Sequence, residues 1–275
     1  MNELCFNTMN RSAYLLGEED PDLLGQVAAA GRAGFRHFGP DSFSIGRFCS
    51  EGGSVEALRD AIADAGMQTF ELPTLAINTD RAVSRAETDR LVGIAAILRP
   101  DFVQLNLDSR MDDRVIEDLR RAGDAFAAVG TRLAIEYLPW LPEVTDIRAT
   151  QDVLARAGIA GAGILVDTWH FTHSKDTWAE LESLSMTELA YVQFDDHPAL
   201  QSSDLVDETL MRRVMPGEGE FELERFADVM KRKGYNGVVS CEILSSKTRS
   251  MDLDAFAKHV FESSARFWRD DPGLD

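Results

Sequence analysis

The chain has 275 residues, of which 28 are Lys or Arg and 47 are Asp or Glu, so its formal net charge is −19. Hydrophobic residues make up 44% of the sequence, which is enough to build a sizeable core. A surface this acidic repels phosphate backbones and anionic lipid headgroups. Composition therefore argues against nucleic-acid binding and against membrane binding.

The N-terminal residues show neither the basic region nor the apolar stretch of a secretory signal. No run in the sequence approaches the ~18 apolar residues that cross a bilayer. The three cysteines, Cys5, Cys49 and Cys241, are odd in number and lack CxxC spacing. Such a set is typical of reduced thiols, so we predict a cytoplasmic protein. The sequence leaves open whether the protein forms a homo-oligomer.

In chain order, a short apolar run, a turn and an Ala/Leu-rich amphipathic stretch recur about eight times, as in an α/β barrel. The predicted strands cover residues 4–8, 35–39, 67–72, 102–107, 132–138, 163–168, 190–195 and 238–244. The predicted helices cover residues 22–33, 55–65, 84–98, 115–128, 149–157, 223–233 and 253–268. Near-continuous apolar strands that alternate with helices indicate a parallel sheet.

Eight such units favour closure into a single (β/α)₈ TIM barrel over an open sheet. The residues after the first strand, 7–11, read NTMNR and lack the GxGxxG of a dinucleotide-binding sheet. We therefore predict one TIM-barrel domain over residues 1–275. The irregular segment 197–220 follows the seventh strand and is too long for an ordinary connection, which is typical of an active-site lid.

Polar side chains end four consecutive predicted strands. Glu136 belongs to the fifth strand, Asp167 to the sixth, Gln193 to the seventh and Glu242 to the eighth. An isolated carboxylate is costly to bury unless it is paired or bound to a metal. In a barrel these strand ends meet at the face where active sites lie. The set therefore predicts one shared cation at that face.

Each residue also has a structural interpretation. A strand-end acid can cap the next helix or pair with an arginine, Gln193 can be a satisfied core amide, and His170 can be a packing residue. Asp195 and Asp196 are adjacent, so their side chains point to opposite sides of the strand. At most one of them can therefore face the barrel interior, and we expect the other to be a solvated loop acid.

The segments IEYLPW, GILVDTWH, YVQFDD, RRVMPGEGEFELERF and GYNGVVSCEIL occur in this order. With them the chain resembles the xylose isomerase-like TIM barrels, a group that includes ketose 3-epimerases, inosose dehydratases and 3-dehydroshikimate dehydratases. The resemblance implies that Glu136, Asp167, Gln193 and Glu242 bind a metal ion. It also implies that His170 contacts the substrate and that Arg213 reaches into the substrate site.

The chain departs from the group's pattern at three places. Most epimerases carry His where this chain has Gln193, and glutamine there is similar to the dehydroshikimate dehydratase branch. The arginine motif of that branch is missing, because the segment after the third strand is TFELPTLAINTD. The glutamate usual at the end of the second strand is absent, since FRHFGP offers only His37 and Gly39. The resemblance therefore implies the metal ligands of this chain, but it does not imply the identity of the substrate.

Three carboxylates and an amide suit Mg²⁺ or Mn²⁺ better than Zn²⁺ or Co²⁺. Such an ion would polarise a carbonyl and acidify the neighbouring C–H. Glu136 and Glu242 could then exchange protons as base and acid, which gives an isomerase or epimerase of a keto sugar or polyol. Alternatively, His170 protonates a departing hydroxyl, which gives a dehydratase of a cyclic hydroxy-ketone.

Other residues and other classes of protein remain as alternatives. Arg213 could bind a substrate carboxylate or phosphate, or lie at the surface. Trp140 and Trp169 could line the substrate pocket or pack in the core.

A barrel related to apurinic-site nucleases would need several zinc ions, many histidines and a basic face, which five histidines and a charge of −19 disfavour. A non-catalytic binding barrel would leave the ligand set unexplained.

Overall fold

The computed structural model describes residues 2–269 of the chain. Met1 and residues 270–275, at the two ends of the predicted domain 1–275, lie outside the described residues. Within 2–269, nine parallel strands form one sheet in the order β3-β2-β1-β9-β8-β7-β6-β5-β4. They are β1 (Leu4–Asn7), β2 (His37–Gly39), β3 (Gln68–Thr69), β4 (Glu71–Asn78), β5 (Phe102–Asp108), β6 (Arg132–Glu136), β7 (Gly163–Asp167), β8 (Leu189–Phe194) and β9 (Val239–Cys241).

Phe70 closes the sheet into a barrel. It separates β3 from β4, which are consecutive segments of the predicted third strand. Its backbone N–H donates to the Phe38 carbonyl at 3.0 Å, and its carbonyl accepts from the Phe102 N–H at 3.1 Å. The nine strands therefore occupy the eight strand positions of a (β/α)₈ barrel, and the predicted TIM-barrel fold is confirmed.

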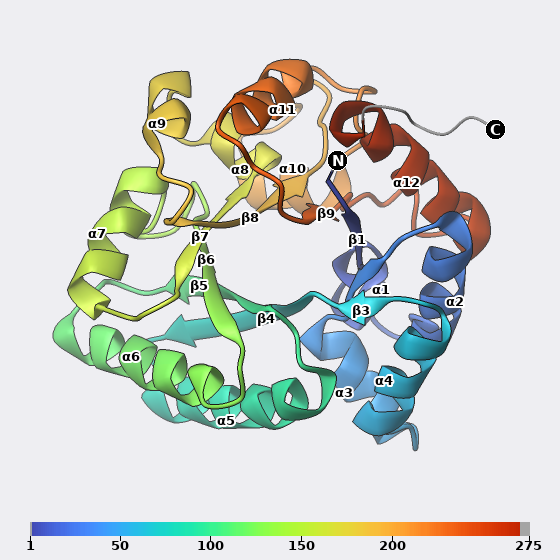
Figure 1. Cartoon of the computed structure of the whole chain (residues 1–275), viewed down its shortest axis with the longest axis horizontal. Coiled ribbons are helices and arrows are strands. Elements are labelled where there is room, and N and C mark those ends of the chain that lie inside the picture. The colour runs from blue at the N-terminus through green and yellow to red at the C-terminus, as the bar shows by residue number, and fades with distance from the viewer. Residues whose placement is uncertain (1, 270–275) are drawn as a thin grey trace.

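Helices surround the strands in Figure 1, as expected for a barrel whose strands are buried on both faces. The longer ones are α2 (Leu23–Ala33), α4 (Val55–Asp64), α5 (Arg81–Leu98), α6 (Asp113–Ala127), α7 (Ile147–Ala157), α11 (Leu223–Arg232) and α12 (Leu253–Trp268). All seven were predicted. The structure adds α1 (Ala13–Leu16), α3 (Ser42–Ser50), α8 (Thr168–His173), α9 (Trp178–Ser183), α10 (Leu205–Met211) and the 3₁₀ helix η1 (Thr8–Arg11).

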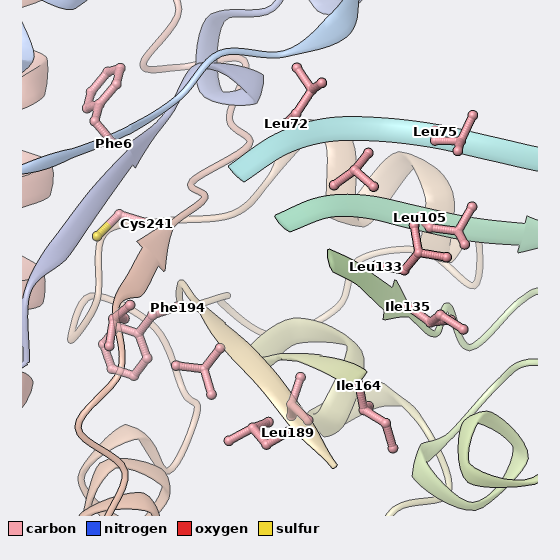
Figure 2. Packing of buried hydrophobic residues seen from close by; sticks show 14 of the residues in the cluster. Phe6, Leu72, Leu75, Leu105, Leu133, Ile135, Ile164, Leu189, Phe194 and Cys241 are labelled. Atoms are coloured by element: carbon pink, nitrogen blue, oxygen red, sulfur yellow. The ribbon is translucent and has the colours of Figure 1, made fainter. Parts of the chain in front are cut away.

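Alternate residues of each strand pack on the two sides of the barrel wall. Phe6, Leu105, Leu133, Ile164 and Phe194 belong to the large cluster that fills the space between strands and helices (Figure 2). A second cluster lies inside the barrel and consists of Cys5, Phe70, Phe102, Ala134, Leu165 and Tyr191. This inner layer closes the end of the barrel opposite to the strands' carboxyl ends, so the polar side chains farther along the strands rest on an apolar floor.

The segment 197–220 is more ordered than the sequence predicts. It contains α10, and it is joined to neighbouring segments by the isolated bridges Asp196–Val214 and Arg212–Ser245. A lid role for this segment stays a prediction. None of the helices within residues 2–269 combines the length and the apolar character needed to cross a membrane.

Candidate active site

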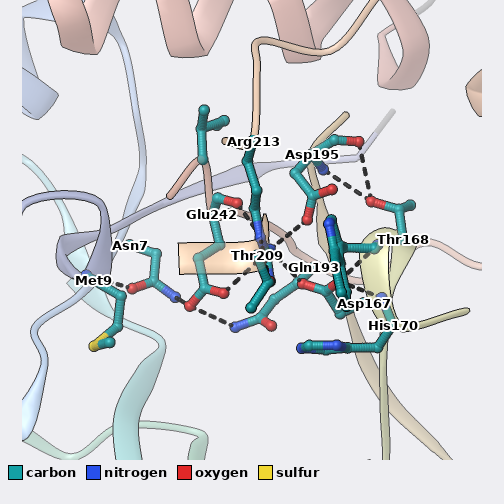
Figure 3. Close-up of polar contacts among 12 residues, drawn as sticks. Asn7, Met9, Asp167, Thr168, His170, Gln193, Asp195, Thr209, Arg213 and Glu242 are labelled. Atoms are coloured by element: carbon teal, nitrogen blue, oxygen red, sulfur yellow. Dashed lines mark hydrogen bonds and ion pairs between the residues drawn. The ribbon is translucent and has the colours of Figure 1, made fainter. Parts of the chain in front are cut away.

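The four predicted metal ligands lie together at the carboxyl ends of adjacent strands. Glu136 ends β6, Asp167 ends β7, Gln193 lies beside Asp167 on β8, and Glu242 follows β9 directly. All four side chains are buried. Figure 3 shows Asp167, Gln193 and Glu242 converging from their separate strands, with His170 beside them. The structure thus brings together the residues that the sequence singles out.

The Gln193 amide lies between the carboxylates. One end of the amide lies 2.9 Å from Glu136 Oε1 and 3.2 Å from Asp167 Oδ2, and the other end lies 3.4 Å from Glu242 Oε1. With its NH₂ group toward Glu136 and Asp167, the amide donates to both carboxylates. With its oxygen toward them, the amide and the two carboxylates present three oxygens that a cation can bind together. The residues present therefore fit a hard cation with oxygen ligands.

Neutral amides orient Glu136. Gln104 Nε2 and Asn106 Nδ2 donate to Glu136 Oε2 at 2.6 and 2.8 Å. The Thr74 hydroxyl donates to Asn106 Oδ1 at 3.0 Å, which fixes the direction of that amide. Because both donors hold Oε2, the Oε1 atom is left to face Gln193 and His170 Nε2, the latter at 3.4 Å.

Two more polar contacts extend this arrangement. Asn7 Nδ2 donates to Glu242 Oε1 at 3.2 Å, and the Asn7 side chain is itself held by the Met9 N–H at 2.8 Å. Gln193 Nε2 lies 3.5 Å from Gln104 Oε1, so Gln104 contacts Gln193 with its oxygen and Glu136 with its nitrogen. Sequence reasoning missed Gln104, Asn106 and Asn7, because these amides lie outside the segments that carry the resemblance, whereas Gln193 lies within one of them.

Asp167 has two structural partners. Its Oδ1 accepts from the Trp169 and His170 N–H groups at 2.7 and 3.0 Å and so caps α8, while its Oδ2 accepts from Arg213 Nη1 at 2.9 Å. Burial alone would raise the pKa of Asp167, but Arg213 and His170 hold that pKa below its ordinary value. The group is therefore ionised at neutral pH.

Arg213 is buried among protein oxygens. Its Nη1 donates to Asp167, to Asp195 and to the Glu242 carbonyl, and its Nε and Nη2 donate to the Thr209 hydroxyl of α10. Burial raises the pKa of Asp195 well above its ordinary value, as do the charges of Asp167 and Glu242, against the opposing effect of Arg213. A surface position for Arg213 is excluded, while its contact with a substrate stays a prediction.

As for Asp195, the surroundings of Glu242 disfavour the charged form of its carboxyl group. Burial raises the pKa of its carboxyl group well above the ordinary value, and the charges of Glu136 and Asp167 raise it further, although Arg213 acts in the opposite direction. A cation bound to these oxygens would remove the repulsion among them.

Asp195 and Asp196 correct one expectation. Asp195 faces the interior, but Asp196 is not a solvated loop acid. Asp196 is buried, and its two oxygens accept from the backbone N–H groups of His197, Gly217, Gly219 and Phe221. The expectation was wrong because the backbone of residues 215–221 folds over this carboxylate and replaces water.

Glu71 is a further interior acid that sequence reasoning did not single out. It lies deeper in the barrel, where it accepts from the hydroxyl groups of Ser240 and Tyr191 and from the Cys5 thiol. Burial raises its pKa to about 7, although the three hydrogen bonds lower it. A Cβ atom on Gly39 would lie 2.6 Å from Glu71 Cγ, so the absence of a side chain at position 39 makes room for it. The sequence signal that could have revealed this acid is the glycine at position 39 together with the ELP segment, which begins with Glu71, on the strand that follows in the chain.

His170, Trp140 and Trp169 stack edge to face on the side of β6 and β7. Their ring centroids lie 5.4 to 5.9 Å apart. Trp169 is fully buried, and Trp140 is half-buried. One oxygen each of Glu136 and Asp167 and a ring nitrogen of His170 lie within 4.8 Å of one another, so this group could hold a metal ion. Substrate contact by His170, Trp140 and Trp169 stays a prediction.

Fold and site together define a TIM-barrel protein with a buried, oxygen-rich cluster at the carboxyl ends of its strands. The family model for the xylose isomerase-like TIM barrel matches residues 26–270, and the chain belongs to that family. The family's members named below are enzymes that isomerise or dehydrate their substrates.

Two curated relatives and one solved structure illustrate the likeness. The 3-dehydroshikimate dehydratase of Pseudomonas putida is 26% identical over 242 residues, which is 84% of this chain and 37% of that protein. The inosose isomerase of Halalkalibacterium halodurans is 24% identical over 139 residues, 50% of this chain and 48% of that protein. The chain thus spans less than half the length of either relative. The crystal structure of the IOLI protein with a zinc atom has a TM-score of 0.82 at 15% identity and covers 96% of this chain and 97% of that one.

Proposed function

We propose that the protein is a divalent-metal-dependent isomerase or epimerase that removes a proton next to the carbonyl of a small keto-polyol. The observation that carries this proposal is the convergence of Glu136 Oε1 and Asp167 Oδ2 on one end of the buried Gln193 amide, with Glu242 at the other end of the same amide. The inosose isomerase relative supports it.

In this proposal Glu136, Asp167, Gln193 and Glu242 hold Mg²⁺ or Mn²⁺. When bound, the ion polarises the substrate carbonyl and acidifies the neighbouring C–H. Glu136 and Glu242 lie on opposite sides of the Gln193 amide, so one can accept the proton and the other can return a proton to the opposite face. His170 binds a substrate hydroxyl through Nε2, and the half-buried Trp140 lines the mouth. We place the protein in the cytoplasm, where its three free thiols would persist.

A dehydratase is the second candidate. His170 Nε2 lies 3.4 Å from Glu136 Oε1, which places a proton donor beside a base. The same pair can remove an α-proton and protonate a departing β-hydroxyl. The 3-dehydroshikimate dehydratase relative favours this candidate by sequence, since its similarity covers more of the chain.

Metal content and proton exchange test the proposal. Protein purified without chelator should carry about one divalent ion per chain and lose thermal stability when EDTA removes it, because ligands that bind only the folded state stabilise it. Glu242→Gln should abolish this response, whereas Glu262→Gln, exposed on α12, should retain it.

In D₂O the metal-loaded protein should exchange the α-proton of a keto-polyol without loss of water. An ultraviolet-absorbing enone product would instead establish the dehydratase. Absence of both from a metal-loaded protein, across ketoses, inososes and 3-dehydroshikimate, would contradict both candidates.

A further inference from the structure

A second polar group lies deeper in the barrel than the predicted metal ligands and takes no part in the proposed mechanism. At its centre is Glu71, which is fully buried. The Tyr191 hydroxyl donates to Glu71 Oε2 at 2.6 Å. The Ser240 hydroxyl and the Cys5 thiol both donate to Oε1, the thiol at 3.6 Å. These three donors offset part of the cost of burying a carboxyl group, a cost that an apolar side chain would avoid altogether.

Ser240 links this carboxyl group to the predicted metal site. Because the hydroxyl proton of Ser240 is donated to Glu71, the hydroxyl oxygen can only accept from its other neighbours. Asn7 Nδ2 carries two hydrogens and donates to that oxygen at 3.4 Å and to Glu242 Oε1 at 3.2 Å. Figure 3 shows Asn7 between Met9 and Glu242. Asn7 Oδ1 accepts from the Met9 N–H at 2.8 Å, so the amide cannot turn over without losing its contacts at both ends.

The hydrogen bonds of this chain all run in one direction. Asn7 donates to Ser240, and Ser240 donates to Glu71, which ends the chain as an acceptor. Without an acceptor at position 71 the Ser240 hydroxyl would be free to rotate, and Asn7 would lose the contact that fixes one of its two hydrogens. The hydrogen that Asn7 donates to Glu242 Oε1 would then be less firmly placed.

We propose that Glu71 is a positioning residue for Glu242 and that it acts through Ser240 and Asn7. This inference rests on the proposed function, in which Glu242 binds the ion and moves a proton, and it adds a residue to which that function gives no role. The chain of hydrogen bonds fixes the direction of Glu242 Oε1. Side chains that orient metal ligands commonly change metal affinity by about 10- to 100-fold when they are replaced, and Glu71 orients Glu242 at two steps' remove.

Mn²⁺ affinity, measured by calorimetric titration of the chelator-treated protein, tests the proposal. Ser240→Ala breaks the chain with little change in volume and should weaken Mn²⁺ binding about threefold or more. Glu71→Leu removes the final acceptor and should weaken binding to the same extent, and Glu71→Ala takes its place where Glu71→Leu does not fold. Glu71→Gln removes the charge but keeps an acceptor for Ser240, so its Mn²⁺ affinity should match that of the wild type within about twofold.

A double variant separates positioning from a general loss of structure. Ser240→Ala/Glu71→Leu should bind Mn²⁺ as Ser240→Ala does, within about twofold, because the link is already broken in the single variant. The matched control is Tyr191→Phe, which removes the donor to the other oxygen of Glu71 and leaves the chain toward Glu242 intact, so its affinity should be unchanged. Additive losses in the double variant would overturn the inference. A loss in Glu71→Gln equal to that in Glu71→Leu would also overturn it, because the charge would then be responsible.

The side-chain NH₂ group of Asn7 gives a readout that needs neither metal nor substrate. Its hydrogens can be followed in EDTA by NMR of protein with ¹⁵N-labelled asparagine and assigned with Asn7→Asp. They should exchange at least about tenfold faster in Ser240→Ala and in Glu71→Leu than in the wild type or in Tyr191→Phe. Equal exchange in all four proteins would contradict the inference.

The two proposals fail differently in these experiments. Wild-type protein that binds no Mn²⁺ contradicts the proposed function, and the exchange of the Asn7 hydrogens then still decides whether Glu71 holds Asn7 in place. Tight Mn²⁺ binding that ignores both Ser240→Ala and Glu71→Leu keeps the proposed function and removes the inference.

Discussion

Gln104 holds two predicted metal ligands at once, through opposite ends of one amide. Its Nε2 donates to Glu136 and its Oε1 faces Gln193 Nε2. Residues that orient metal ligands in this way commonly change metal affinity by about 10- to 100-fold when they are replaced. We therefore expect Gln104→Leu, which keeps the volume and removes both contacts, to weaken Mn²⁺ binding by about tenfold or more.

Calorimetric titration of the chelator-treated protein measures this affinity directly. The matched control is Gln26→Leu, a buried amide in α2 that donates to the Pro21 and Arg11 carbonyls and to none of the predicted metal ligands. An unchanged Mn²⁺ affinity in Gln104→Leu, with Gln26→Leu folded and equally tight, would show that Glu136 and Gln193 need no help from Gln104.

The sequence indicates the acids of the site and Gln193, and it misses the other amides around them. Glu136, Asp167 and Glu242 are conspicuous because each interrupts an apolar strand. Gln104 and Asn106 are also inside β5, but an amide is cheap enough to bury that its presence implies no ligand. Their role depends on the register of β5 against β6, which places Leu105 beside Ile135 and which no local pattern specifies.

At the scale of elements, one carboxylate organises the loop between α10 and α11. Asp196 accepts four backbone N–H groups, three of them from residues 217–221. Removing the acceptor leaves buried donors without partners, and hydrogen bonds to a charged group contribute about 1.5–3 kcal/mol each. Asp196→Ala should therefore lower the free energy of unfolding by about 3 kcal/mol, if part of the loop relaxes toward water.

Hydrogen exchange locates the effect. The amides of Gly217, Gly219 and Phe221 should lose protection in Asp196→Ala, while those of β8 keep most of theirs. Asp204→Ala removes a comparable but exposed cap of α10 and should leave the three amides protected. Unchanged exchange at Gly217 and Gly219 would contradict the anchoring role.

Long helices and buried strands follow from the sequence, whereas short helices do not. The seven predicted helices have ten or more residues and an amphipathic period that stands out in a window of that length. Helix α8 has six residues, and it forms because Asp167 caps it and the core surrounds Trp169. Short helices depend on such tertiary contacts, because their own hydrogen bonds barely offset the cost of nucleation.

At the scale of the whole molecule, the barrel encloses several buried acids, among them Glu71, Asp195 and Glu242, and stability should depend on pH accordingly. Burial raises the pKa of Glu71 from 4.5 to about 7. The folded protein therefore binds a proton at Glu71 more tightly than the unfolded chain does, so the stabilisation is complete below pH 4.5 and is lost as the pH rises through 7.

The variant Glu71→Gln lacks this titration. Between pH 5 and pH 8, wild-type protein should lose stability relative to the variant by an amount on the order of 3 kcal/mol. Urea denaturation of both proteins in EDTA measures the difference, and contributions from Asp195 and Glu242 largely cancel because both proteins contain them. A difference that is equal at the two pH values would show that Glu71 titrates normally.

The double duty of Asp167 has a consequence for experiments on this family member. One of its oxygens caps the N-terminus of α8, and the other accepts from Arg213 and faces the predicted ion. Replacing Asp167 would therefore remove the cap of a helix, an ion-pair partner of the buried Arg213 and a predicted metal ligand at the same time. Loss of activity in such a variant would therefore not show whether Asp167 acts in catalysis through the metal ion. Glu136 and Glu242 anchor no helix, and substitutions there can separate the chemistry of the ion from the integrity of the scaffold.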